Sequence, residues 1–332
     1  MVDFPANPEY QGELARSHQN LALLLGELQE YSETERHLKR AMGLLDELAA
    51  QHPELPEYRR LQERNVSALG QLAREKNRLQ DAERYFRRAM ELTQKLVGEF
   101  PTVIDYRSDL GGCSDDLSDV LLKTVRWQEA DKMTGDSLVL WKNLAAKFPE
   151  VVPYQSGLAN ALKNRGRLSL QRGQAGEAQK LLQEAITHVR TALKENSQTV
   201  RYRENLRAQY KYLIQARMMQ GDNPGALNAA SELATSFPDN AEDTFSAGCS
   251  LARCMPLLGK DSGFSKEKSK QAVDLYGKRA LELLRQALDR GFRDSAQLKK
   301  EPNLEPLRSN SDFQRLLAEV NESKRKQNQG HH

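Results

Sequence analysis

Two pairs of charged residues have the spacing that would let them act together on a binding partner. Asp115 and Asp119 are four residues apart, and Lys163 and Arg167 have the same separation. On a helix, this spacing places both members of a pair on one face. The pairs therefore suit recognition of a peptide that has an acidic part and a basic part. They suit equally well two solvated helix faces whose ion pairs contribute under about 1 kcal/mol each.

Residues for catalysis or metal binding do not gather in the same way. Gly111 and Gly112 lie in a helical register and lack the glycine spacing that cradles a phosphate group. Cys249 and Cys254 have no second Cys or His pair nearby, whereas structural zinc needs four grouped ligands. We expect these cysteines to be small buried thiols. The sequence therefore predicts no enzyme, no metal site and no cofactor.

The composition narrows the class of partner and the compartment. The 332 residues carry 49 Lys and Arg against 46 Asp and Glu, a net charge of +3. This balance gives little support to a nucleic-acid or membrane partner, because such partners need a concentrated basic excess. No apolar run approaches the roughly 18 residues of a bilayer span, and three cysteines suit a reducing compartment. We therefore expect a cytoplasmic protein.

A repeat of 48 residues runs through most of the chain. Tyrosine recurs at this spacing, at Tyr10, Tyr58, Tyr106, Tyr154 and Tyr202. A proline stands five residues before each of the first four, beside Phe or His. We expect each tyrosine to open a first helix and to pack at the seam between repeats.

Each repeat has the pattern of two helices with a break between them. In the second repeat, apolar residues recur at helical spacing from Tyr58 to Ala73 and again from Ala82 to Leu96. The break holds one residue per repeat: Gln29, Asn77, Val125, Gly173 and Gly221. Asn or Gly at three of these five positions fits the left-handed residue that ends a helix. Small residues elsewhere would let the two helices approach closely: Gly70, Gly166, Ala82, Ala130 and Ala178.

Helix pairs with one apolar stripe must stack to bury it, so the sequence predicts an all-α fold, a right-handed α-solenoid of antiparallel helix pairs. We expect five repeats over residues 1–240, the fifth shortened, an irregular sixth pair over 241–290 and capping helices over 291–323. Residues 324–332 are expected to be a disordered tail that ends in a tag remnant, His331 and His332. The chain begins out of phase, since Phe4-Pro5 matches the end of a repeat. This suggests a piece of a longer protein, or else a capping segment.

The small and large positions resemble the tetratricopeptide repeat. Two repeats carry that family's spacing: Leu69, Gly70, Ala82, Phe86 and Ala89 in the second, and Gly166, Ala178, Leu182 and Ala185 in the fourth. The repeat here has 48 residues, against about 34 in the family. The extra length adds roughly two turns to each helix. The resemblance implies that the first helices line a concave groove in which extended or helical peptides dock.

The family's groove positions fall on residues whose charge alternates along the array. They are Arg16, Gln19 and Leu23 in the first repeat, Arg64, Ser67, Gln71 and Arg74 in the second, Asp115, Asp116 and Asp119 in the third, Asn160, Lys163 and Arg167 in the fourth, and Lys211, Gln215 and Met218 in the fifth. The resemblance implies a groove that is basic, then acidic, then basic, and that takes a protein or peptide. Lys163 and Asn164 match part of a carboxylate clamp known in the family, but Arg167 replaces an expected Asn, so that specificity is not transferred.

Two other segments resemble the repeat arrays that follow the catalytic domain of certain bacterial serine/threonine protein kinases. They are the repeat boundary at 100–110 and the tail from Gly291-Phe292-Arg293-Asp294 to Asp312-Phe313. The kinase motifs themselves, a Gly-rich loop, His-Arg-Asp and Asp-Phe-Gly, do not occur. The resemblance implies a bacterial signalling protein whose kinase lies upstream.

Three functions are open at this point. The leading hypothesis is a non-catalytic interaction module or scaffold that holds a protein or peptide. Single-stranded RNA binding is an alternative, supported by basic residues of the second, fourth and fifth repeats but opposed by the acidic third repeat. Self-association is the other, as a homodimer, because the first repeat leaves exposed the face that an earlier repeat would cover.

Overall fold

The computed structural model describes residues 7–197, 199–236, 240–258 and 266–329. Within those ranges the chain forms fourteen α-helices, one 3₁₀-helix and no strand, which confirms the predicted all-α fold. The chain divides into two compact units, Met1–Leu168 and Ser169–His332, and each is described by itself. Phe4-Pro5 and the histidines at 331 and 332 lie outside the described residues.

Unit 1 contains six helices and most of a seventh. Each first helix has 20 residues and each second helix has 21, in agreement with the regular register of the sequence. The helices are α1 Pro8–Glu27, α2 Tyr31–Gln51, α3 Pro56–Glu75, α4 Leu79–Glu99, α5 Ile104–Lys123, α6 Trp127–Lys147 and α7 Val152–Gln171.

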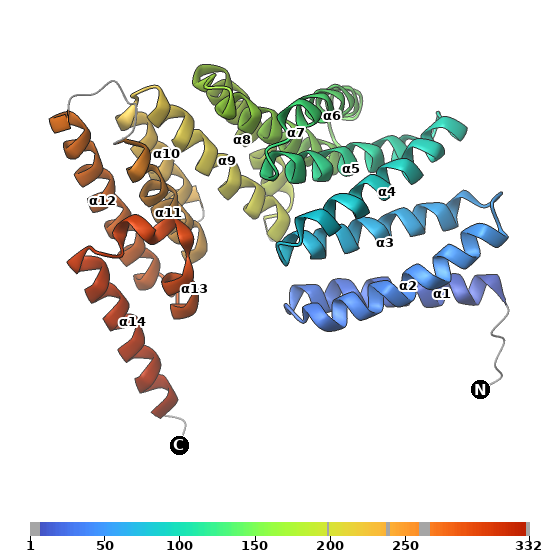
Figure 1. Ribbon diagram of the computed structural model, residues 1–332, viewed down its shortest axis with the longest axis horizontal. Coiled ribbons are helices and arrows are strands. Elements are labelled where there is room, and N and C mark those ends of the chain that lie inside the picture. The colour runs from blue at the N-terminus through green and yellow to red at the C-terminus, as the bar shows by residue number, and fades with distance from the viewer. Residues whose placement is uncertain (1–6, 198, 237–239, 259–265, 330–332) are drawn as a thin grey trace. The chain divides into compact units, whose positions relative to one another are not determined.

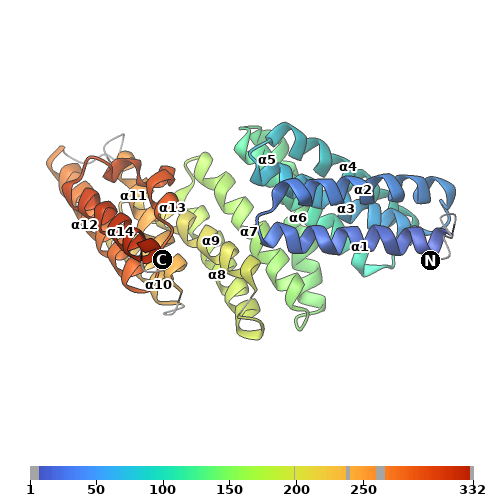
Figure 2. The same cartoon turned by 90° about the horizontal axis from the view of Figure 1, so that it is seen from below.

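The helices of unit 1 stack in chain order. Each of α1 to α5 packs against the next helix along the chain, as the colours from blue to green show in Figure 1. The first helices also contact one another, α1 with α3 and α3 with α5. Figure 2 shows α1 and α2 side by side where the chain begins. Such stacking buries the apolar stripe of each pair against its neighbours, as a solenoid requires.

The turn inside each helix pair repeats the same backbone geometry. In the third repeat the N–H of Arg126 donates to the carbonyl of Leu121 at 2.9 Å, and in the second Arg78 donates to Ala73 at 2.8 Å. This bond closes a Schellman motif, which needs a left-handed residue just before the donor. The left-handed residue predicted from Asn77, Gly173 and Gly221 is confirmed, with φ of 57°, 73° and 75°. Gln29 and Val125 adopt the same conformation, with φ of 61° and 63°.

Small residues allow the close approach of paired helices. A Cβ placed on Gly70 would lie 2.6 Å from Cε1 of Phe86, so only glycine fits there. Ala82 and Ala130 are fully buried at the matching positions of the second helices. Gly166, on α7, is also buried.

The tyrosines at the seams have aromatic neighbours in three repeats. Ring centroids lie 6.0 Å apart in each pair: His52 with Tyr58, Phe100 with Tyr106, and Phe148 with Tyr154. Tyr10, at the start of α1, differs from the expected packing because 59% of its surface is exposed. The reason is that α1 is the first described helix, so no earlier helix covers it.

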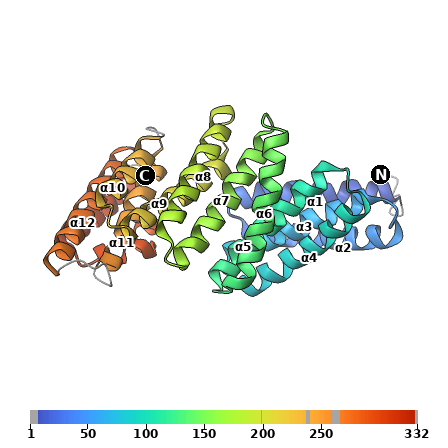
Figure 3. The same ribbon diagram turned by 90° about the horizontal axis from the view of Figure 1, so that it is seen from above.

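Unit 2 continues the helix pairs with a shortened member. The helix α10 has 14 residues, against 21 in α8. The small residues Ala178 on α8 and Ala226 on α10 are fully buried. Tyr202 is half-buried on α9. Figure 3 shows α9, α10, α11 and α12 next to one another, and each contacts the next. The helices are α8 Ala175–Glu195, α9 Val200–Met219, α10 Asn223–Ser236, α11 Ala241–Leu258 and α12 Lys266–Asp289.

The end of unit 2 packs onto α11 and α12. It comprises α13 Ser295–Lys300, the 3₁₀-helix η1 Pro302–Leu307 and α14 Ser311–Gln329. Gly291, with φ of 100°, ends α12, and the ring of Phe292 stacks on Phe245 at 4.2 Å. The helix α14 continues past residue 323, where the sequence predicts a disordered tail to begin. The Lys, Arg and Gln residues of that segment are good helix formers, which explains the difference.

Candidate functional site

The predicted partner-binding residues occupy the first helices of the two units. Those from Arg16 to Arg167 lie on α1, α3, α5 and α7 in unit 1, whereas Lys211 and Gln215 lie on α9 in unit 2. In unit 1 the contacts of α1 with α3 and of α3 with α5 join the first helices into one layer. This layer is the candidate binding face.

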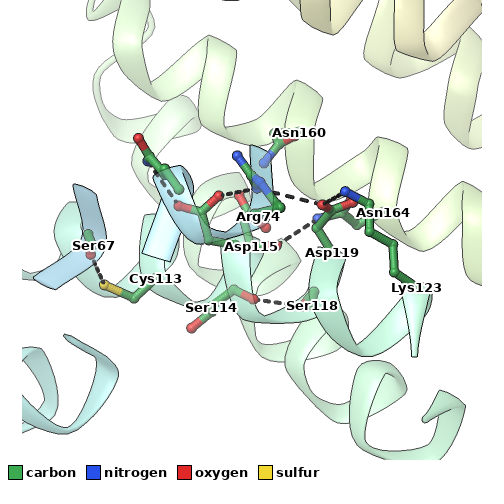
Figure 4. Close-up of polar contacts among 12 residues, drawn as sticks. Ser67, Arg74, Cys113, Ser114, Asp115, Ser118, Asp119, Lys123, Asn160 and Asn164 are labelled. Atoms are coloured by element: carbon green, nitrogen blue, oxygen red, sulfur yellow. Dashed lines mark hydrogen bonds and ion pairs between the residues drawn. The ribbon is translucent and has the colours of Figure 1, made fainter. Parts of the chain in front are cut away.

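Asp119 on α5 is the centre of an ion-pair cluster on this face. Its carboxylate accepts from the guanidinium of Arg167 on α7, lies 3.0 Å from Nζ of Lys123 and lies 3.6 Å from Nη1 of Arg74 on α3. We call these four residues the Asp119 cluster. Figure 4 shows Asp119 between Arg74 and Lys123. Although burial alone would raise the pKa of Asp119, the three cations, with Arg167 foremost, and the nearby Lys163 hold it well below its usual range.

A second carboxylate of α5 joins α3 to α5. Nη1 of Arg74 lies 2.8 Å from Oδ1 of Asp116, and Nε2 of Gln71 donates to Oδ2 of Asp116 at 3.3 Å. The Asp119 cluster and this contact therefore tie three neighbouring first helices together. The fold brings the predicted basic and acidic residues together, and the carboxylates of Asp116 and Asp119 are both paired with cations of the chain.

Lys163 on α7 is a half-buried cation beside the Asp119 cluster. Its ammonium group donates to the side-chain oxygen of Asn160, one turn earlier. Burial, together with the positive charge of Arg167 and Arg74, lowers the pKa of Lys163 to about 8, although Asp119 and Asp115 oppose the shift. The amine is still mostly charged at neutral pH, and an incoming anion would stabilise that charge.

Asp115 is buried and so does not have the partner-binding role that the sequence predicts. It is 2% exposed, and its carboxylate accepts hydrogen bonds from Ser137 and from Nε1 of Trp141, at 3.0 Å, both on α6. Its backbone carbonyl accepts from Nδ2 of Asn164 at 3.1 Å (Figure 4). Burial raises the pKa of Asp115 to about 7. The structure thus assigns Asp115 to the packing of α5 on α6, because Trp141 reaches it from the second helix.

The predicted residues of the first two repeats have separate surroundings. Arg16 is exposed and pairs with Glu13 at 3.5 Å. Gln19 donates from Nε2 to the carbonyl of Leu61 at 2.9 Å and so ties α1 to α3. Arg64 is exposed on α3. Among the described residues of α1 and α3, Arg16 and Arg64 are the exposed cations, and Arg16 is paired with Glu13.

In unit 2 the two predicted residues lie close to Tyr212 and Arg253. Nζ of Lys211 lies 5.7 Å from the centre of the Tyr212 ring, and Gln215 accepts a hydrogen bond from the guanidinium of Arg253 on α11. A shallow cavity of about 410 Å³ in unit 2 lies elsewhere, between α12 and α14, and has Met255, Leu281 and Leu316 in its wall. The predicted residues do not line that cavity.

Comparison with known proteins identifies the repeat. The tetratricopeptide repeat model matches residues 67–101, which cover the end of α3 and all of α4. The chain is a tetratricopeptide-like helical repeat protein. No curated protein sequence matches it.

Two solved structures share this tetratricopeptide-like fold. The apo form of RapI is 13% identical, with a TM-score of 0.50, and the match covers 94% of this chain and 99% of that one. The S. pombe nuclear import adaptor Nro1 is 11% identical, with a TM-score of 0.51, and the match covers 94% and 99% of the two chains. At these identities the likeness shows the fold alone.

The tetratricopeptide-like array contains a buried polar cluster between α3 and α5 that the sequence did not predict. Glu63 is 3% exposed, and its Oε1 accepts from Oγ of Ser67 at 2.8 Å and from Sγ of Cys113 at 3.1 Å. Burial raises the pKa of Glu63 to about 7. The equivalent positions hold the small residues Ala15, Gly111 and Ala159 in three other repeats, but Arg207 in the fifth. The register therefore gave only a partial indication that this carboxyl group is buried.

Metal binding and membrane insertion find no support in the described part of the chain. There, no three His, Cys, Asp or Glu side chains gather so that they could hold a metal ion. No helix in that part combines the length and apolar character of a bilayer span.

Proposed function

We propose that this tetratricopeptide-like chain is a non-catalytic interaction module that holds a protein or peptide on the first helices of unit 1. The fold supports a scaffold role, because stacked helix pairs present a long face made from one helix of each pair. The face that carries the Asp119 cluster is the best candidate. It contains charged side chains held in ion pairs, and it contains Lys163, whose positive charge is only partly compensated.

The occupant of this face is an acidic segment of the partner. The carboxylates of Asp116 and Asp119 already form ion pairs with cations of the chain itself. A basic ligand would therefore gain little from pairing with either of them. Lys163 carries the proposal: it is half-buried, and burial is the main cause of its lowered pKa. An aspartate or glutamate of the partner would offset the cost of burying that charge and make charge-assisted hydrogen bonds. Arg64, exposed on α3, extends the same positive character.

Fluorescence anisotropy with two labelled peptides tests this function. One peptide contains Leu with Asp and Glu, and the other has Lys at each acidic position. We expect the acidic peptide to bind and the basic one not to bind. Lys163→Gln should weaken binding about tenfold, because a hydrogen bond between charged groups is lost. Arg84→Gln is the control, since that side chain is 72% exposed on α4, away from this face. Equal binding of both peptides, or equal loss in both variants, contradicts the proposal.

Single-stranded RNA is the third probe in the same titration. If RNA binds with strong salt dependence and the acidic peptide does not bind, the result favours RNA binding over peptide binding as the function. Absence of salt-dependent RNA binding removes that alternative.

We also propose that the module serves a cytoplasmic bacterial signalling protein, such as a serine/threonine kinase. The support is the resemblance of the tail from Gly291 to Phe313 to kinase-associated arrays. The reading frame upstream of Met1 tests this context. A kinase domain in that frame would support it, and a start codon at Met1 would contradict it.

A further inference from the structure

The contact between α1 and α2 contains two facing histidine rings. Nδ1 of His18 on α1 lies 2.8 Å from Nδ1 of His37 on α2, and the two ring centroids are 5.0 Å apart. His37 is buried and His18 is half-buried. At this distance one nitrogen carries a hydrogen that it donates to the lone pair of the other. The contact therefore has room for one proton between the two rings.

The next repeat has an apolar contact at the same place. Val66 and Tyr85 stand 48 residues after His18 and His37. Val66 is fully buried, and Tyr85 packs against the apolar cluster that contains it. An ionisable pair thus takes the place of apolar side chains where the two helices of the first repeat meet. The packing of α1 on α2 depends on protonation, whereas the packing of Val66 does not.

A second proton on the histidine pair opposes the packing of α1 on α2. When both rings are charged, both Nδ1 atoms carry a hydrogen, so the hydrogen bond is lost and two positive charges face each other. Burial of His18, and then the charges of His37 and Arg40, lower the pKa of His18 below its usual value. The two rings titrate as one coupled pair, and its second protonation is the unfavourable step.

The acidic groups of α1 and α2 closest in sequence to the pair already have cationic partners. Glu33 stands one turn before His37 on α2 and is paired with Arg36. Glu13 on α1 is paired with Arg16 at 3.5 Å. Neutralising a doubly charged pair with either carboxylate would break one of these ion pairs.

The remaining surroundings of α1 hold it weakly. From α3 come neutral groups: the carbonyl of Leu61 accepts from Gln19 at 2.9 Å, and Nδ2 of Asn65 donates to a backbone carbonyl of α2 at 2.8 Å. The outer face of α1 is open, since Leu14 and Leu24 are 48% and 58% exposed, and Figure 2 shows no helix of unit 1 over it. Elements with few buried apolar contacts open locally at a low cost in free energy.

We propose that the contact between α1 and α2 is an acid-sensitive switch, in which the pair formed by His18 and His37 takes up a second proton and α1 separates from α2. The opened chain binds both protons near the ordinary histidine pKa of about 6.5, whereas the closed contact accommodates one. The closed state is therefore fully stable above pH 6.5 and loses stability as the pH falls below that value. Opening removes Arg16 and Gln19 from the candidate binding face, whatever ligand that face holds.

Hydrogen exchange of the full chain, measured by mass spectrometry at about pH 7.5 and about pH 5.5, tests the switch. After correction for the intrinsic exchange rate, the protection of the α1 amides should fall about tenfold at the lower pH. The protection of α4 should not fall. His18→Val combined with His37→Tyr recreates the residues of the second repeat, so its α1 should be equally protected at both pH values.

Two further variants complete the test. His188→Leu on α8 is the matched control, because it also replaces a histidine by the residue of other repeats, Leu44 and Leu92. It should keep the loss of protection in α1. His18→Gln leaves one ionisable ring in the contact and should abolish the loss even if the double variant does not fold, which circular dichroism checks. The proposal is overturned if α1 of the unaltered chain is equally protected at both pH values. It is also overturned if the loss persists in His18→Gln or in the folded double variant, or if His188→Leu abolishes it.

Discussion

The indole Nε1 of Trp141 donates a 3.0 Å hydrogen bond to Oδ2 of Asp115, and this buried contact joins α6 to α5 within the third repeat. Glycines on both neighbouring first helices make room for the indole. A Cβ on Gly111 would lie 2.7 Å from the ring, and one on Gly157 would lie 2.6 Å from it. Trp141 thus connects α5, α6 and α7.

Replacing Trp141 should weaken unit 1 more than replacing the other tryptophan. Trp141→Phe removes a donor from a buried carboxylate, which we expect to cost about 1–3 kcal/mol of the free energy of unfolding. Trp127→Phe is the matched control, because Trp127 is 38% exposed, and surface changes usually stay within about 0.5 kcal/mol. Urea unfolding of the two variants checks this. Equal losses would show that the hydrogen bond to Asp115 has no special weight.

Replacing Gly70 by alanine should lower the stability of the chain. Gly70→Ala places a Cβ 2.6 Å from Phe86, so either the ring or the helix must move. Such overpacking costs about 1–3 kcal/mol. Gly43→Ala, in a helix with nothing within 4 Å of the new Cβ, should instead stabilise by up to about 1 kcal/mol. Thermal unfolding distinguishes them, and a stabilising Gly70→Ala would contradict the packing described here.

Replacing Val125 by glycine should stabilise the turn. Val125 has φ of 63°, which costs an L-residue about 1–2 kcal/mol, and its branched Cβ adds to the strain. We expect Val125→Gly to raise the free energy of unfolding by about 1 kcal/mol. Val200→Gly, at the first turn of α9 and 66% exposed, should lower it. Loss of stability in both variants would count against a strained turn.

The buried carboxyl group of Glu63 should make stability depend on pH. Its folded pKa, about 7, is above the unfolded value of 4.5. The folded state therefore binds the extra proton, and this contribution is complete below pH 4.5 and is lost as pH rises through 7. It amounts to about 3 kcal/mol at most. Glu63→Gln does not titrate, so its stability relative to the unaltered chain should increase from pH 5 to pH 8. A constant difference over that range would refute this assignment.

The regular part of the fold follows directly from the sequence. The left-handed turn residues were predictable from Asn77, Gly173 and Gly221, and the 48-residue register places Val125 at the same point after its helix, where a Schellman motif needs such a residue. The close approach at Gly70 was predictable for the same reason. Both features depend on local geometry that every repeat shares.

The candidate site was only partly predictable, because it depends on contacts between repeats. Asp115 stands at a groove position by register, yet it turns to Trp141, a residue whose equivalents are Leu45, Thr93 and Val189. The sequence placed opposite charges on neighbouring first helices, but the distances at which Asp119 meets Arg74 and Lys123 emerge only from the packing.

The protonation of Lys163 tests the proposed function most directly. Titration of its side chain by carbon-13 NMR should give a pKa of about 8 in the free protein. Saturation with the acidic peptide should raise that pKa towards the ordinary 10.5, because a carboxylate stabilises the charged amine. The basic peptide should leave it unchanged. A Lys163 pKa that does not respond to the acidic peptide would contradict the claim that this face binds an acidic partner.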